Sequence, residues 1–105
     1  MRTLILFATT ALVLSTTHSL ADSYQTASNL GDVLASEKPC ALSYDQPAIQ
    51  SFIDTHVDAD DMEFPGNLSS AVFAANYTIG DMTPSQLTAH CAQIERIARA
   101  FRFID

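Results

Sequence analysis

The chain has 105 residues, with 12 Asp and Glu against 5 Lys and Arg and a formal net charge of −7. This length suits one small domain and leaves no room for a dinucleotide-binding fold of ordinary size. The acidic balance argues against a nucleic-acid binder, because such proteins hold the phosphate backbone with a basic surface.

The first 21 residues have the pattern of a secretory signal peptide. Arg2 supplies the positive charge, residues 4–14 form the apolar stretch, and Ser19 and Ala21 place small residues at the −3 and −1 positions of a cleavage site. An apolar helix of 11 residues is too short to cross about 30 Å of hydrocarbon, which argues against a membrane anchor. We therefore expect a periplasmic or secreted protein, residues 22–105, with 4 basic and 12 acidic residues, a net charge of −8 and no membrane span.

Two cysteines, Cys40 and Cys91, remain in the mature chain. In the oxidising compartment that an exported chain enters, such a pair usually closes into one disulfide. A loop of about 50 residues closed in this way contributes about 4 kcal/mol of stability, a large share for so small a domain. A reactive thiol would need a basic setting, a redox pair would need Cys-x-x-Cys, and a zinc site would need four clustered ligands.

Helical patterns follow one another along the mature chain. Residues 22–28 are polar and without periodicity, and we expect them to be mobile. Leu30, Val33 and Leu34 then have the i, i+3, i+4 spacing of a short helix that ends before Pro39.

A second helix is expected after Asp45, which is a good N-cap residue and is followed by Pro47 in the first turn. The acidic run 58–63 ends this helix, and residues 64–66 (Phe-Pro-Gly) are predicted to form a turn. The apolar stripe of the helix consists of Ile49, Phe52, Ile53 and His56.

Asn67 is predicted to cap a third helix, which ends at Gly80. The spacing of its apolar residues is typical of a helix that buries one face. This face consists of Leu68, Ala71, Val72, Ala75 and Ile79.

The last helix has the strongest start signal, because residues 83–86 (Thr-Pro-Ser-Gln) form a capping box with proline at the first helical position. Its apolar stripe consists of Leu87, Cys91, Ile94, Ala98 and Phe101, so we expect a buried disulfide. The opposite, solvated side carries Arg96, Arg99 and Arg102, and Glu95 can pair with Arg99. No alternating pattern is long enough for a sheet. The sequence therefore predicts an all-α fold, a small three- or four-helix bundle with one disulfide.

The acidic loop 58–63 is the place to look for a cation, because hard ions bind several carboxylate oxygens of one flexible loop. The spacing differs from that of a helix-loop-helix calcium loop, since Glu63 replaces the glycine of the sixth position and Ser69 the acid of the twelfth. We interpret the loop as a solvated turn and predict no metal or other cofactor. The candidate ligands, if a cation binds, are Asp58, Asp60, Asp61 and Glu63.

Two histidines are candidate pH sensors. His56 lies on the apolar stripe of its helix, and His90 lies at the edge of the last stripe, next to Cys91. A partly buried neutral histidine takes up a charge as the pH falls, which loosens the packing around it. The alternative is a histidine at a helix end or core edge whose hydrogen bond is satisfied.

No catalytic motif is found. The sequence lacks Gly-x-Ser-x-Gly, His-Glu-x-x-His, Gly-x-Gly-x-x-Gly and Walker patterns, and its 3 glycines are too few for tight phosphate-binding loops. A catalytic Cys–His pair is disfavoured because the thiol is expected to be oxidised. We therefore predict that the protein is not an enzyme.

Residues 43–53, 60–64 and 82–97 carry a resemblance that covers nearly all of the mature chain. They are similar to a group of short exported alphaproteobacterial proteins with two cysteines and no established activity, some of which are labelled "signal recognition particle". A net charge of −8 conflicts with that label, because the particle is a cytosolic assembly on RNA.

The cysteine positions resemble, more loosely, those of the acid-activated periplasmic chaperones of the Hde family, which are small helical proteins with one disulfide. The matching features are Cys40 just before a helix, Thr83-Pro84 at a helix start and Cys91 within that helix. The chain departs from that family between the cysteines and at the C-terminus, where three arginines replace a Lys-rich tail. The resemblance therefore implies only that Cys40 and Cys91 form the disulfide.

The sequence thus predicts an exported, non-catalytic helical protein that binds another periplasmic protein, in the manner of a chaperone or an inhibitor. Its carboxylates lose their charge near about pH 4, which removes self-repulsion and favours contact through the apolar stripes on acidification. The alternative is a metal- or small-ligand-binding protein that uses loop 58–63. Neither nucleic acid nor a membrane is an expected partner, and the oligomeric state is left open.

Overall fold

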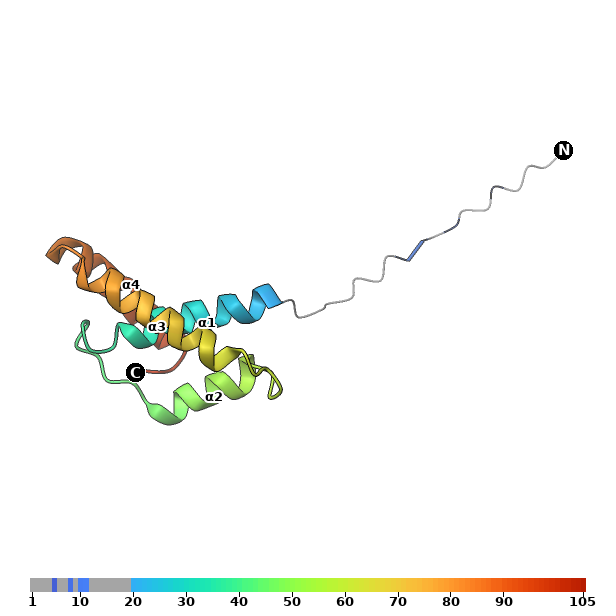
Figure 1. Cartoon of the computed structure of the whole chain (residues 1–105), viewed down its shortest axis with the longest axis horizontal. Coiled ribbons are helices and arrows are strands. Elements are labelled where there is room, and N and C mark those ends of the chain that lie inside the picture. The colour runs from blue at the N-terminus through green and yellow to red at the C-terminus, as the bar shows by residue number, and fades with distance from the viewer. Residues whose placement is uncertain (1–4, 6–7, 9, 12–19) are drawn as a thin grey trace.

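A computed structural model describes residues 5, 8, 10, 11 and 20–105 of the chain. In chain order its helices are α1 (Leu20–Ala35), α2 (Gln46–His56), α3 (Phe64–Gly80) and α4 (Pro84–Ala100) (Figure 1). These residues contain no strand, so the predicted all-α bundle is confirmed, with four helices. Most of the predicted signal peptide lies outside the described residues. Within the part that the structure describes, no helix combines the length and the apolar character that a membrane crossing requires.

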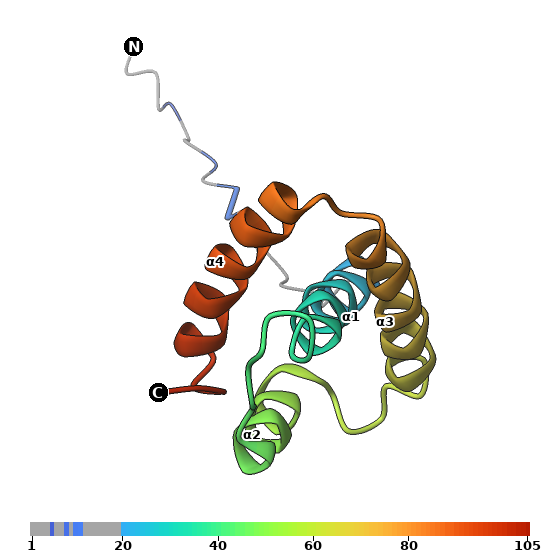
Figure 2. The same ribbon diagram turned by 90° about the vertical axis from the view of Figure 1, so that its left-hand side faces the viewer.

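Helix α1 is the centre of the bundle, with α3 and α4 on either side of it and α2 next to its remaining side (Figure 2). Residues 22–28, which we expected to be mobile, are helical, and Ala27 is only 1% exposed. That prediction was wrong because Ala27, Leu30 and Leu34 continue one helical face, and a single alanine among polar residues is a weak signal of burial. The buried residues of α1 and the turn after it are Ala27, Leu30, Gly31, Val33, Ala35 and Ser36.

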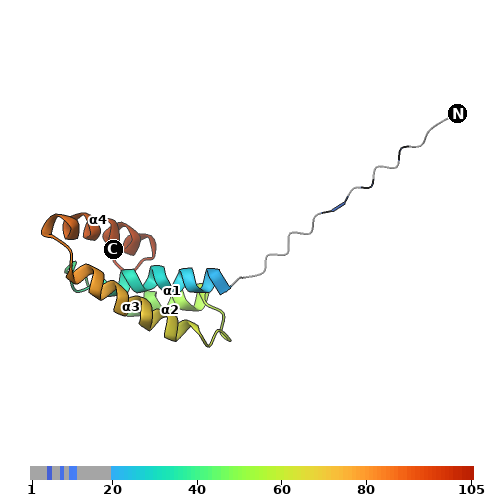
Figure 3. The same cartoon turned by 45° about the horizontal axis from the view of Figure 1, so that its top comes forward.

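Helices α1 and α3 pack side by side and run in the same direction (Figures 1 and 3). They form the most extensive interhelical contact of the structure. A Cβ atom added to Gly31 would lie 2.5 Å from the Cβ of Ala71 and 3.1 Å from the backbone nitrogen of Val72. Glycine at this position therefore allows the two backbones to approach more closely than a side chain would permit. A small core cluster in the α1–α3 pair consists of Ala35, Ala75 and Ile79.

The larger core forms where the chain beyond α4 turns back towards the start of α2. Phe103 is 1% exposed, and its ring centroid lies 5.6 Å from that of Tyr44 and 5.9 Å from that of Phe52. Arg102 makes the turn with a φ of 62°, in the left-handed region. The backbone N–H of Asp45 then donates to the carbonyl oxygen of Phe103 over 2.8 Å. This return of the C-terminal segment has no local sequence signal and was not predicted.

Helix α2 begins after Asp45 as predicted, although the Asp45 side chain makes no capping hydrogen bond. Its apolar side chains are half-buried against the larger core, so α2 covers that core without burying any residue completely. These side chains are Ile49, Phe52 and Ile53.

Helix α3 begins at Phe64, earlier than the predicted cap at Asn67. The predicted turn at 64–66 was wrong because Asp61 caps this end from the preceding loop. Its Oδ1 accepts hydrogen bonds from the backbone N–H groups of Glu63 and Phe64, both over 3.1 Å. A proline in the first turn, here Pro65, suits a helix start, so the residue that was interpreted as part of a turn belongs to the helix.

Helix α4 begins with the predicted capping box. The Thr83 hydroxyl accepts from the backbone N–H of Gln86 over 3.2 Å, and the Gln86 side-chain oxygen accepts from the backbone N–H of Thr83 over 2.9 Å. Ile94 and Ala98 are buried, which confirms the predicted core face. On the outer side the arginines are exposed, and Arg99 pairs with Glu95 over 3.9 Å.

Candidate functional site

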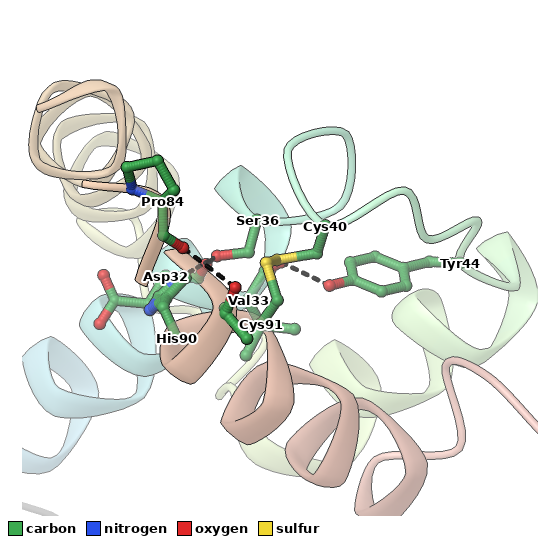
Figure 4. The surroundings of a disulfide bond; sticks show 9 residues. Asp32, Val33, Ser36, Cys40, Tyr44, Pro84, His90 and Cys91 are labelled. Carbon is green, nitrogen blue, oxygen red and sulfur yellow. Dashed lines mark hydrogen bonds between the residues drawn. A yellow bond between two sulfur atoms is a disulfide. The ribbon is translucent and has the colours of Figure 1, made fainter. Parts of the chain in front are cut away.

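The disulfide between Cys40 and Cys91 is present as predicted, and the two Cα atoms lie 5.3 Å apart (Figure 4). It joins the loop after α1 to the middle of α4, across a sequence separation of 51. Both cysteines are half-buried, whereas we expected a buried disulfide. The reason is that α4 makes far fewer contacts with α1 than α3 does, so the apolar stripe of α4 is covered only in part.

A hydrogen-bonded chain next to the disulfide makes a second link between α4 and α1 (Figure 4). Ser36 is 0% exposed, and its hydroxyl oxygen lies 2.6 Å from the carbonyl oxygen of Asp32 and 2.8 Å from Nε2 of His90. Because a carbonyl can only accept, Ser36 donates its one proton to Asp32 and accepts a hydrogen bond from Nε2–H of His90. The neutral ring protonated at Nε2 and the imidazolium both donate this bond. The hydrogen bond from His90 to Ser36 therefore does not require a neutral ring.

A groove of about 460 Å³ lies between α1 and α4, and His90 is one of the residues that line it. Its apolar residues are Val33 and Ile94, which are buried, Ile97 and Phe101, which are half-buried, and Ala100, which is exposed. Its polar residues are Asn29, Asp32, His90 and Gln93. The two walls of the groove are the helices α1 and α4. The disulfide and the His90–Ser36 hydrogen bond connect α4 to the end of α1 and so position the two walls relative to each other.

The other candidate pH sensor, His56, is exposed at the end of α2. Its ring contacts that of Phe52 in a tilted arrangement with a centroid distance of 4.4 Å. The expected partial burial on the apolar stripe is wrong, because the covered part of the stripe ends at Ile53 and the last turn of α2 faces solvent. His56 and His90 line different hollows of the surface.

Within the acidic loop, Asp61 has structural contacts. It is half-buried, and its Oδ2 accepts a hydrogen bond from the hydroxyl of Ser23 on α1, while its Oδ1 caps α3. The Ser23 hydrogen bond and, less strongly, the backbone N–H groups lower the pKa of Asp61, against an opposing effect of desolvation. Asp61 thus connects the loop to both helices of the α1–α3 pair. The remaining carboxylates of the loop, those of Asp58, Asp60 and Glu63, are exposed.

A wide hollow of about 840 Å³ lies between the first turns of α1 and this loop. It is acidic, because Asp22 and all four acidic residues of the loop line it together with His56. In the part of the chain that the structure describes, however, no group of three or more His, Cys, Asp or Glu side chains is placed to hold a metal ion. The candidate ligands that the structure does not bring together in this way are Asp58, Asp60, Asp61 and Glu63.

Comparison of the chain with protein-family models, with curated proteins and with solved structures finds no match. The candidate site therefore depends on the geometry alone. Sequence reasoning missed the groove because the predicted stripe on α4 left out Ile97, which lines the groove together with Ile94 and Phe101 of that stripe. The signal in the sequence was the position of Ile97, three residues after Ile94 and four before Phe101, which extends the stripe on one side.

Proposed function

We propose that this protein is an exported, non-catalytic binding module of the bacterial periplasm that holds an apolar segment of another protein in the groove between α1 and α4. The observation that carries the proposal is the apolar lining of that groove on two helices fixed by the disulfide. Concave, mostly apolar surfaces with a few polar groups at their edges are the usual form of a binding site. The signal peptide pattern supports the compartment, and the disulfide agrees with an oxidising environment.

The charge of the chain narrows the class of partner. Residues 22–105 carry 12 acidic and 4 basic residues, and Asp32 lines the groove itself. A segment with basic residues beside its apolar side chains is therefore favoured over an acidic one. Both a chaperone-like role towards unfolded chains and an inhibitor-like role towards one folded protein fit this chemistry.

Acidification belongs to the same proposal, through carboxylates rather than through the His90–Ser36 link. Protonation of Asp61 removes a charge that its hydrogen bonds to Ser23 and to the start of α3 stabilise. Loss of carboxylate charge also lowers the self-repulsion of a strongly acidic chain. We expect looser packing around the acidic loop and greater exposure of apolar surface as the pH falls through the lowered pKa of Asp61.

The test uses a charge placed in the groove and the same charge placed outside it. Ile97→Asp puts a carboxylate in the apolar lining, whereas Ala92→Asp puts one on the exposed surface of α4. The readouts are binding of a lysine-flanked leucine-rich peptide and suppression of the aggregation of a reduced test protein. Apolar-dye binding and near-ultraviolet dichroism are followed between about pH 7 and about pH 2.5.

We expect Ile97→Asp to weaken peptide binding at least about tenfold, which corresponds to about 1.4 kcal/mol, while Ala92→Asp binds like the unaltered chain. Far-ultraviolet circular dichroism of each variant is the control for correct folding. Absence of binding and of aggregation suppression at every pH would eliminate the proposed function, and equal effects of the two variants would eliminate the groove.

The acidic hollow supports a second candidate function, the binding of a small cationic ligand. Its size and its five carboxylate residues favour a flexible polyamine over a single metal ion, which needs ligands that converge on one point. Calorimetric titration with spermidine, calcium, zinc and manganese tests this candidate. Heat with spermidine supports it, and flat traces with all four reject it.

A further inference from the structure

Helix α3 presents an unusual outer face. Phe73 and Tyr77 are 78% and 79% exposed, although large aromatic side chains are normally covered. They lie one helical turn apart and therefore share one side of the helix. Phe64, Ala75 and Ile79 are buried on the opposite side. Both sides of α3 thus carry large apolar side chains, which predicts that the outer one also has a partner.

Charge separates this face from the rest of the surface. Helix α3 contains no Asp, Glu, Lys, Arg or His, whereas each of the other three helices contains charged residues. In a chain of net charge −8 for residues 22–105, α3 is where a second equally acidic copy can approach with the least repulsion. An occupant with an uncharged face fits better than a basic segment, because α3 offers no carboxylate to pair with a cation.

The sequence of this face is complementary to itself. If two α3 helices pack antiparallel about a two-fold axis at Phe73, each residue a given number of positions after Phe73 meets the residue the same number before it in the other copy. The two Phe73 rings then meet at the axis, and Tyr77 lies over the small side chain of Ser69. Gly66 likewise meets Gly80, and a Cβ atom added to either glycine would have no neighbour within 4 Å, so the approach of a second backbone is open.

From these observations we infer that the chain forms a two-fold symmetric homodimer through the outer face of α3, which goes beyond the proposed function and leaves the α1–α4 groove free. A helix of 17 residues is about 26 Å long and about 10 Å wide, so the contact buries a few hundred Å² per partner. Stable complexes bury about 800 Å² per partner. The dimer is therefore expected to be weak and concentration-dependent.

Sedimentation equilibrium of the mature protein between about 10 μM and about 1 mM tests the inference. Phe73→Asp places a charge at the axis, and the residue is exposed, so the fold is retained. Ala92→Asp on α4 adds the same charge elsewhere. We expect dimers of the unaltered chain and of Ala92→Asp, and at least a tenfold higher dissociation constant for Phe73→Asp. A monomer at the highest concentration, or equal dimerisation of both variants, overturns the inference.

Two further measurements distinguish this contact from other modes of association. Screening of like charges predicts that sodium chloride strengthens the dimer, whereas pairing of the arginines of α4 with the acidic loop of another copy would weaken with salt. A photo-crosslinking benzoylphenylalanine in place of Tyr77 is expected to label the peptide that contains Ser69. Weakening by salt, or labelling confined to the acidic loop, contradicts the α3 interface even if dimers form.

Discussion

Helix α3 meets α1 through a close crossing of small residues, whereas α4 meets α1 at few points and is held by other means. Those means are the disulfide, the His90–Ser36 hydrogen bond and the burial of Phe103 beyond the end of α4. This difference between the α1–α3 and α1–α4 contacts explains how a thin bundle keeps an apolar groove uncovered. Where packing is complete there is no room for a ligand, and where packing is sparse, local links replace it and the space between the helices remains accessible.

The largest expected effect comes from the covalent link of α4. Replacing both Cys40 and Cys91 by Ser removes a crosslink between positions 51 apart, which is expected to lower the free energy of unfolding by about 4 kcal/mol. Urea unfolding of the double variant and of Ala92→Ser, which is expected to change stability by less than about 0.5 kcal/mol, measures this. A loss below about 1 kcal/mol would show that other contacts suffice to hold α4.

The next effect tests the close crossing of α1 and α3. Gly31→Ala places a methyl group 2.5 Å from the Cβ of Ala71, so the helices must move apart. We expect a loss of about 3 kcal/mol. The matched control is Gly66→Ala on α3, where the new methyl group has no neighbour within 4 Å and helix propensity favours alanine. Equal melting temperatures of the two variants would contradict a close contact between α1 and α3 at Gly31.

Tyr44 predicts a loss of stability in alkali. Its hydroxyl donates to the carbonyl oxygen of Val33 over 2.8 Å, and burial, helped by the charge of Glu37, raises the pKa of Tyr44 to about 12. Since this value lies above the ordinary value of 10.0, stability from Tyr44 is fully present below about pH 10 and is lost as the pH rises towards about 12.

Tyr44→Phe is expected to cost about 1 kcal/mol at neutral pH and to flatten the decline above about pH 10. Tyr77→Phe, at a residue that is 79% exposed, is the control and should leave the decline unchanged. Urea unfolding at neutral pH and at several alkaline pH values measures both the loss of stability and the decline. An undiminished decline in Tyr44→Phe would assign the alkaline loss to another group.

The smallest effect concerns the acidic loop. The lowered pKa of Asp61 means that its stabilising contribution is present above the ordinary carboxyl value, near about pH 4, and is lost as the pH falls through the folded-state pKa. Asp61→Asn should lower the melting temperature at pH values near neutrality and match the unaltered chain in strong acid. Asp60→Asn, at an exposed residue, should have no effect at either pH.

Local signals in the sequence predicted much of the fold. The capping box at Thr83, the start of α2 after Asp45 and the disulfide each follow from residues that act on their immediate neighbours or from the cysteine count. The groove and the return of Phe103 were missed, because both depend on which segments meet in space. Gly31 had no signal either, since a glycine in a helix pattern does not show whether another backbone crosses there.

Hydrogen exchange of the oxidised and the reduced protein tests most directly whether α4 is a separate unit that the disulfide holds against the α1–α3 pair. Under mild native conditions, reduction is expected to lower protection of the backbone amides of α4 and of the returning segment at Phe103. The amides of α1 and α3 near Gly31 and Ala71 should keep most of their protection. Equal loss in all four helices would contradict the account, because it would show that α1, α3 and α4 form one cooperative unit.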